Sequence, residues 1–74
     1  MRVVSEMHEA ITAAVRNQDS RAHVAVSELA GVYVITIVVP LEHSLLDNLH
    51  RVHAVAASIC AGLPQPYSLQ VLCQ

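Results

Sequence analysis

The chain has few charged residues and few glycines, and each shortage excludes a class of protein. Charged residues make up 14% of the 74 residues, against about 25% in ordinary globular chains. The formal charge of −2, with histidines neutral, argues against nucleic-acid binding, which needs a basic face to neutralise phosphates. With two glycines in total, the chain cannot build a P-loop, a paired-glycine dinucleotide loop or a G-x-S-x-G elbow.

Cysteine and long apolar runs are also scarce. Cys60 and Cys73 are too few for a disulfide framework. The strongest apolar run, Val32–Val39, is far shorter than the ~18–20 residues needed to cross a bilayer. Acidic Glu6 falls where the apolar segment of a signal peptide would lie. We therefore expect a cytoplasmic protein with free thiols and no direct membrane insertion.

What the chain has in abundance is apolar side chains. Hydrophobic residues make up 54% of the sequence, which excludes a disordered chain. The length predicts a single domain over residues 1–74, and a domain of this size buries only about 60% of its unfolded surface. Because its core is small and its surface is poor in charge, we expect the chain to bury apolar area against a second copy.

Hydrophobic periodicity predicts an α+β chain in the order α-β-β-α-β. The expected elements are a helix over residues 2–17 ended by the turn-prone residues 17–20, strands over 23–28 and 32–39 joined by a turn at 30–31, a helix with an apolar stripe over 45–63, and a strand over 67–73. Ser44 is the expected N-cap of the second helix, with Asp47 completing a variant of the capping box. Gly62 and Pro64 are expected to stop that helix.

This order predicts a three-stranded mixed sheet, because a hairpin is followed by a helical crossover to a third strand. Both helices would then cover the same face of the sheet. Val32–Val39 is apolar at nearly every position, which is typical of a strand buried on both faces. A second chain is the expected cover for the other face.

Histidine is unusually frequent in this sequence. The residues with metal-ligating side chains are His8, His23, His43, His50, His53, Cys60 and Cys73. Imidazole and thiolate are the ligands that borderline-soft divalent metals prefer. His50 and His53 lie three apart on one helix face, and Asp47 could bind a metal or orient a histidine.

Spacing alone does not decide between ligands and ordinary side chains. No H-E-x-x-H or C-x-x-C motif is present. A histidine pair on a helix flank is also consistent with two solvated imidazoles. Cys60 lies near the apolar stripe and is expected to be a buried thiol. Cys73, close to the chain end and without a disulfide partner, stays a candidate ligand.

Four segments together resemble a known family. Residues 35–40, 44–50 and 61–64 and the closing strand 67–73 are similar to the C-terminal cytoplasmic domain of cation diffusion facilitators, which transport zinc, iron and manganese. The resemblance covers nearly the whole chain through short motifs. It implies a ferredoxin-like fold, a homodimer and a bound transition metal.

The resemblance also implies a ligand set. His23 matches the histidine that often precedes the family's first strand, and His50 matches its helical histidine. The family's closing His-x-Asp/Glu is replaced by Val71-Leu72-Cys73, which puts Cys73 in place of the carboxylate. A thiolate favours Zn²⁺ or a similar divalent transition metal, such as Cd²⁺, Cu²⁺ or Ni²⁺, over Mn²⁺.

The resulting expectation is a non-enzymatic, homodimeric, metal-binding domain with His23, His50 and Cys73 as ligands. Its role would be regulation, metal sensing or buffering related to cation efflux, and a membrane cation transporter is a candidate partner. The alternative is a ferredoxin-like dimerisation or small-molecule sensor domain that binds no metal.

Overall fold

The computed structural model describes residues 3–43 and 45–74. Its elements are α1 (Val3–Gln18), β1 (His23–Leu29), β2 (Val32–Val39), the short 3-10 helix η1 (Leu41–His43), α2 (Leu46–Cys60) and β3 (Tyr67–Cys73). The predicted order α-β-β-α-β is confirmed, with η1 as the one short element that the sequence did not indicate. The α+β, ferredoxin-like description is likewise confirmed.

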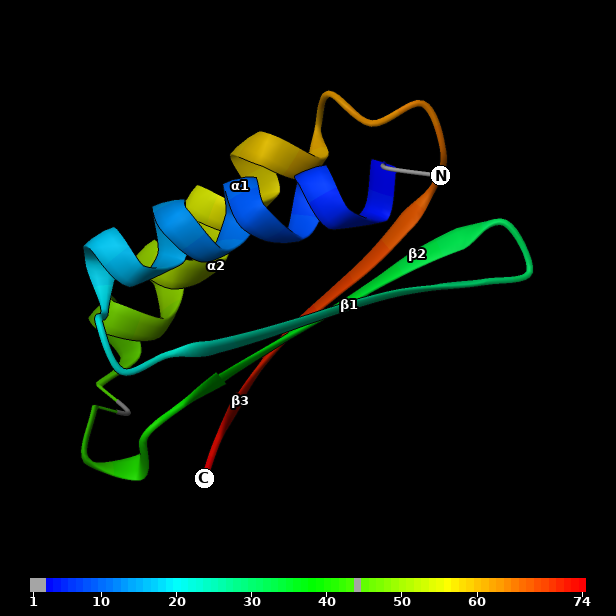
Figure 1. Cartoon of the computed structure of the whole chain (residues 1–74). Helices are drawn as coiled ribbons and strands as arrows, with labels where there is room; N and C mark the ends of the chain where they lie inside the picture. Colours follow the sequence, from blue (N-terminus) through cyan, green and yellow to red (C-terminus); the bar gives the residue numbers. More distant parts are fainter. Residues whose placement is uncertain (1–2, 44) are drawn as a thin grey trace.

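The three strands form one mixed sheet in the order β1-β2-β3. β1 pairs with β2 antiparallel through a hairpin, and β2 pairs with β3 in parallel. Parallel neighbours need a long crossover connection, and α2 provides it. Figure 1 shows α1 and α2 on the same side of the sheet, as the sequence predicted.

The core lies between the two helices and one face of the sheet. Burial alternates strictly along β2: its odd-numbered residues are buried and its even-numbered residues are half-buried. The buried apolar residues are Met7, Ile11, Val15, Ala22, Tyr33, Ile35, Ile37, Val39, Val52, Ala56 and Cys60. Since successive strand residues point to opposite faces, the odd-numbered residues of β2 define the helix-covered face.

The hairpin turn lies where the sequence predicted it. Ala30 and Gly31 have φ angles of 52° and 79°, the positive values that a two-residue hairpin loop of type I′ requires. Glycine adopts this conformation freely, whereas a residue with a Cβ bears a cost of roughly 1–2 kcal/mol. Ala30 is therefore a locally strained residue that the pairing of β1 with β2 holds in place.

The predicted boundaries of α2 were wrong at both ends. The N-cap is Leu45, with no side-chain hydrogen bond to the helix; Ser44, the expected cap, lies outside the described residues. Leu45 has extended backbone (ψ 135°), so its side chain leaves the helical phase and is 76% exposed. The helix ends at Cys60 with Ala61 as its C-cap, short of residue 63, the end of the predicted stripe; Leu63 precedes Pro64, a position that disfavours helical geometry.

The buried face of α1 is formed by Met7, Ile11 and Val15, because their four-residue spacing places them in one row. Val4 packs against this core, and Ala10 is exposed. Within residues 3–43 and 45–74, neither helix has the length and apolarity that a membrane crossing demands.

The second face of the sheet is left uncovered by the helices, as expected. We call it the open face. It comprises His23, Ala25, Ser27, Leu29, Val32, Val34, Thr36, Val38, Ser68, Gln70 and Leu72. Leu29 and Leu72 at its margins are 71% and 39% exposed.

The two faces of β2 should differ in their contribution to stability. Val39→Ala, at a fully buried position, is expected to lower the free energy of unfolding by about 2 kcal/mol through lost burial and a residual cavity. Val34→Ala on the open face is the matched control and should cost less than about 1 kcal/mol. Urea denaturation at low protein concentration measures both, and equal losses would contradict the assignment of faces.

Candidate functional site

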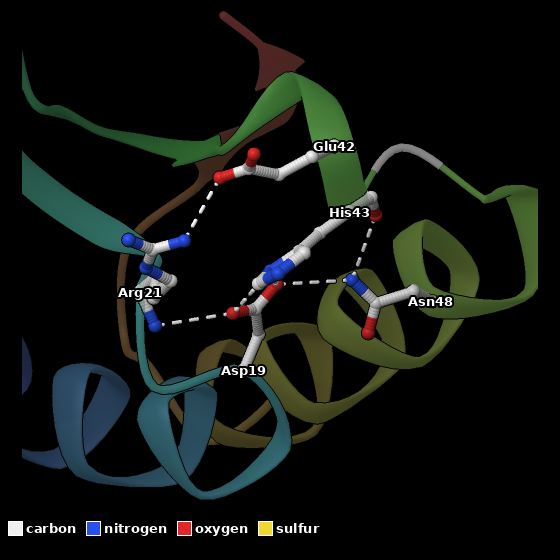
Figure 2. Close-up of polar contacts among 5 residues, drawn as sticks. All are labelled: Asp19, Arg21, Glu42, His43 and Asn48. Carbon is white, nitrogen blue, oxygen red and sulfur yellow. Dashed lines mark hydrogen bonds and ion pairs between the residues drawn. The ribbon is translucent and has the colours of Figure 1, made fainter.

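A cluster of polar side chains joins four elements at one end of the molecule. Asp19 directly follows α1, Arg21 precedes β1, Glu42 and His43 lie in η1, and Asn48 lies in the first turn of α2. Figure 2 shows the Asp19 carboxylate at the centre of these contacts. We call these five residues the Asp19 cluster.

Asp19 is the buried member of the cluster, with a side chain 3% exposed. Its carboxylate accepts hydrogen bonds from the Arg21 backbone N–H at 3.1 Å and from Asn48 Nδ2 at 3.0 Å. His43 Nδ1 lies 3.1 Å from both carboxylate oxygens. Asn48 also donates to the His43 carbonyl at 3.0 Å. A buried carboxylate is tolerated because it is paired and hydrogen-bonded in this way.

These contacts determine the ionisation of Asp19. Burial on its own would raise the pKa of the carboxyl, because it disfavours the charged form. The hydrogen bonds from Arg21, Asn48 and His43, together with the attraction of His43, outweigh burial and hold the pKa of Asp19 below its ordinary value. The carboxylate therefore stays charged in the folded protein at all but strongly acidic pH.

The contact with Asp19 also orients His43. An ionised carboxylate only accepts hydrogen bonds, so His43 Nδ1 carries the proton and Nε2 is the other ring nitrogen. A carboxylate orients a catalytic or metal-binding imidazole in the same way. Either chemistry needs further groups beside Nε2, and the described residues show no hydrogen bond from that atom to a hydroxyl or thiol. The geometry therefore supports a structural role for this contact, which holds the end of α1 against η1.

The outer pair of the cluster adds little energy. Arg21 and Glu42 approach to 2.8 Å, but their side chains are 64% and 66% exposed. Exposed ion pairs contribute at most about 1 kcal/mol, because water screens them and side-chain entropy opposes them. Most of the stabilisation that the cluster provides therefore comes from the part-buried contacts of Asp19 with Arg21, His43 and Asn48.

Two of the three expected metal ligands lie on opposite faces of the sheet. His23 pairs with Val38 and so belongs to the open face. Cys73 pairs with Val39 and so belongs to the helix-covered face. Since neighbouring residues of a strand point in opposite directions, the sheet itself separates the imidazole of His23 from the thiol of Cys73.

The third expected ligand does not bridge this separation. His50 is exposed on α2, on the helix side of the sheet. Across the described part of the chain, no three His, Cys, Asp or Glu side chains gather in a way that could hold a metal ion. The expected site of His23, His50 and Cys73 therefore does not form within one chain.

The other candidate ligands occupy separate environments. His53 is exposed on α2. His8 on α1 contacts the Val24 carbonyl, with Nε2 at 2.9 Å. Cys60 is 1% exposed, as expected, and burial raises the pKa of its thiol. A buried thiol of raised pKa is a poor nucleophile and a poor metal ligand.

The Asp19 cluster was missed at the level of sequence. Asp19 was interpreted only as a turn residue, and His43 only as one of the residues with metal-ligating side chains. Their contact joins positions 24 residues apart, so it depends on tertiary packing. The one local signal was an Asp immediately after a helix, where such a side chain commonly accepts a hydrogen bond from a backbone N–H two residues on.

Comparisons with protein-family models, with curated proteins and with solved structures found no match. The resemblance to the cation diffusion facilitators therefore stays a prediction from the sequence.

The lowered pKa of Asp19 predicts an acid-dependent loss of stability. The folded-state pKa lies below the unfolded value, near 3.8, so the stabilisation is complete above that pH and is lost as the pH falls through the folded-state pKa. Asp19→Asn should remove this dependence and cost about 2 kcal/mol near neutral pH, because the amide cannot accept all three hydrogen bonds.

Thermal unfolding followed by circular dichroism from about pH 7 to pH 2 measures the effect. Asp47→Asn is the matched control, because Asp47 is 75% exposed and pairs with Arg51 across one helical turn. It should change stability by less than about 0.5 kcal/mol. An Asp19→Asn profile parallel to that of the wild type would contradict the assignment.

Proposed function

We propose that this chain is a self-associating binding module that packs the open face of its sheet against the open face of a second copy. The observation that carries the proposal is the row of Val32, Val34 and Val38, half-buried on the central strand with no helix over it. Burying such a row against another apolar surface removes it from water, and this is the main driving force of association.

The chemistry of the open face favours a second copy over a charged partner. Its eleven residues include no Asp, Glu, Lys or Arg. A symmetric dimer places each group near its own counterpart, so a face without fixed charge avoids like-charge repulsion. A partner selected by charge would find no complementary group there.

The size of the face sets the expected strength of the dimer. Three strands of about seven residues give a footprint of roughly 330 Å² per copy, from the usual strand rise and spacing. Stable specific dimers bury about 1,200–2,000 Å² in total. The two copies together offer less than this, so we expect a concentration-dependent dimer with a dissociation constant in the micromolar range.

Face-to-face packing is also supported by a contact at the outer edge of β1. The Val24 carbonyl at the outer edge of β1 is already bonded to His8 at 2.9 Å. An added strand would have to displace this contact. The open face requires no such rearrangement, because its side chains already face outward.

The metal-binding role implied by the family resemblance would need ligands from two copies. One chain offers no group of three ligands among its described residues, whereas His23 lies on the proposed dimer face. Under this hypothesis Zn²⁺ would bind the dimer and not the monomer.

A charge in the middle of the open face should abolish dimerisation. Val34→Asp would bury a carboxylate against its own copy at the centre of the interface, which is strongly unfavourable. We expect sedimentation equilibrium to show a monomer–dimer equilibrium for the wild type and a monomer for the variant. Val34→Thr, which keeps β-branching, should weaken the dimer without unfolding the chain.

Ala13→Asp is the matched control, because Ala13 is exposed on α1, away from the open face. It should dimerise as the wild type does. A wild-type protein that stays monomeric at millimolar concentration would refute the proposal, as would a folded Val34→Asp variant with unchanged dimerisation.

Calorimetric titration with Zn²⁺ separates the two candidate roles. We expect no stoichiometric binding to monomeric Val34→Asp, because no three ligands converge in one chain. Binding to the wild type that Val34→Asp and His23→Ala both remove would establish a metal site across the dimer. Stoichiometric binding to the monomer would contradict the separation of ligands described above.

A further inference from the structure

A small pocket lies between α1 and the beginning of β1. It has a volume of about 210 Å³ and is lined by His8, Thr12, Arg16, Ala22, His23 and Val24. His8, Thr12 and Arg16 follow one another at four-residue spacing, so they form one row along α1 that faces the edge of β1. Drug-sized ligands need roughly 300–1,000 Å³, so this pocket suits a much smaller group.

The charge of the lining favours an anion. Arg16 is permanently cationic and His8 and His23 become cationic on protonation, whereas no acidic residue is among the lining residues that the structure describes. Arg21 and Arg51 each form an ion pair with a carboxylate. Arg16 has no such pair among the described residues, which leaves its guanidinium available to a ligand.

Thr12 provides a second and independent observation. Its hydroxyl oxygen is buried and has no hydrogen-bond partner within the described part of the chain. A buried polar group without a partner costs about 1–3 kcal/mol. A ligand oxygen in the pocket would accept a hydrogen bond from this hydroxyl and remove this cost.

The edge of β1 adds a backbone donor. The Val24 carbonyl faces α1, since it accepts from His8 Nε2 at 2.9 Å. In an antiparallel strand the N–H and C=O of one residue point to the same side, so the Val24 N–H faces α1 as well. The contact also fixes the proton of His8 on Nε2, because a carbonyl only accepts.

We infer that this pocket binds a phosphate group, either inorganic phosphate or the terminal phosphate of a small molecule. The guanidinium fork of Arg16 matches two oxygens of an oxyanion. The Thr12 hydroxyl and the Val24 N–H supply donors from other directions, which the tetrahedrally arranged oxygens of a phosphate can reach more readily than the coplanar oxygens of a carboxylate.

The test is a titration of the ¹⁵N-labelled full chain with inorganic phosphate at about pH 6, where imidazoles carry more positive charge. We expect saturable shifts at the amides of Thr12, Arg16 and Val24. Arg16→Gln should weaken binding at least tenfold, since it removes a charged hydrogen-bond donor. Arg51→Gln, with the same loss of charge on α2, should leave affinity unchanged.

Thr12→Val separates a ligand-binding role from a structural one. The substitution removes the unpartnered hydroxyl at nearly constant volume, so the unfolding midpoint should stay the same or rise, while phosphate affinity falls several-fold. Val34→Asp should still bind phosphate, because Arg16, Thr12 and Val24 lie outside the open face, so failure of the dimer proposal would not remove this site.

Phenyl phosphate and acetate define the ligand class. Tighter binding of phenyl phosphate than of inorganic phosphate would assign the pocket to a small phosphorylated molecule, and equal binding would assign it to free phosphate. Absence of saturable shifts would overturn the inference. So would acetate binding as tightly as phosphate, or Arg51→Gln weakening affinity as much as Arg16→Gln.

Discussion

The structure depends on one constraint: a sheet has two faces, and this chain has helices for only one. The odd-numbered residues of β2 pack against α1 and α2, whereas no described helix packs over its half-buried even-numbered residues. The helices and strands are all formed, but the hydrophobic core covers only one face of the sheet. The proposed role as a self-associating module follows from this imbalance between the two faces of the same strand.

The Asp19 cluster stabilises the end of the molecule where apolar packing is thin. Leu41, Leu45 and Leu46 around η1 and the start of α2 are each at least 67% exposed, so this corner has little buried apolar area to stabilise it. The buried Asp19 carboxylate stabilises this corner in place of apolar packing. Its hydrogen bonds are charge-assisted, and such bonds are stronger and more directional than neutral ones. The polar cluster thus fixes how α1, η1 and α2 meet.

Local sequence signals predicted the strands better than the site. The bounds of β2 follow from a β-branched run ended by Pro40, and those of β3 follow from alternating apolar residues. The turn at residues 30–31 follows from one glycine. His23 and Cys73 are separated within one chain for a reason that strand parity already contains. His23 aligns with Val38 and Cys73 with Val39, and a difference of one residue sends the two side chains to opposite faces.

The contact between His8 and the Val24 carbonyl has a consequence for assembly beyond two copies. A three-stranded sheet with both edges free is a template for open-ended growth into fibres. Here His8 of α1 occupies the Val24 carbonyl at the β1 edge. A strand that pairs with this edge would have to displace that contact, so the helix that covers the core also hinders open-ended growth through β1.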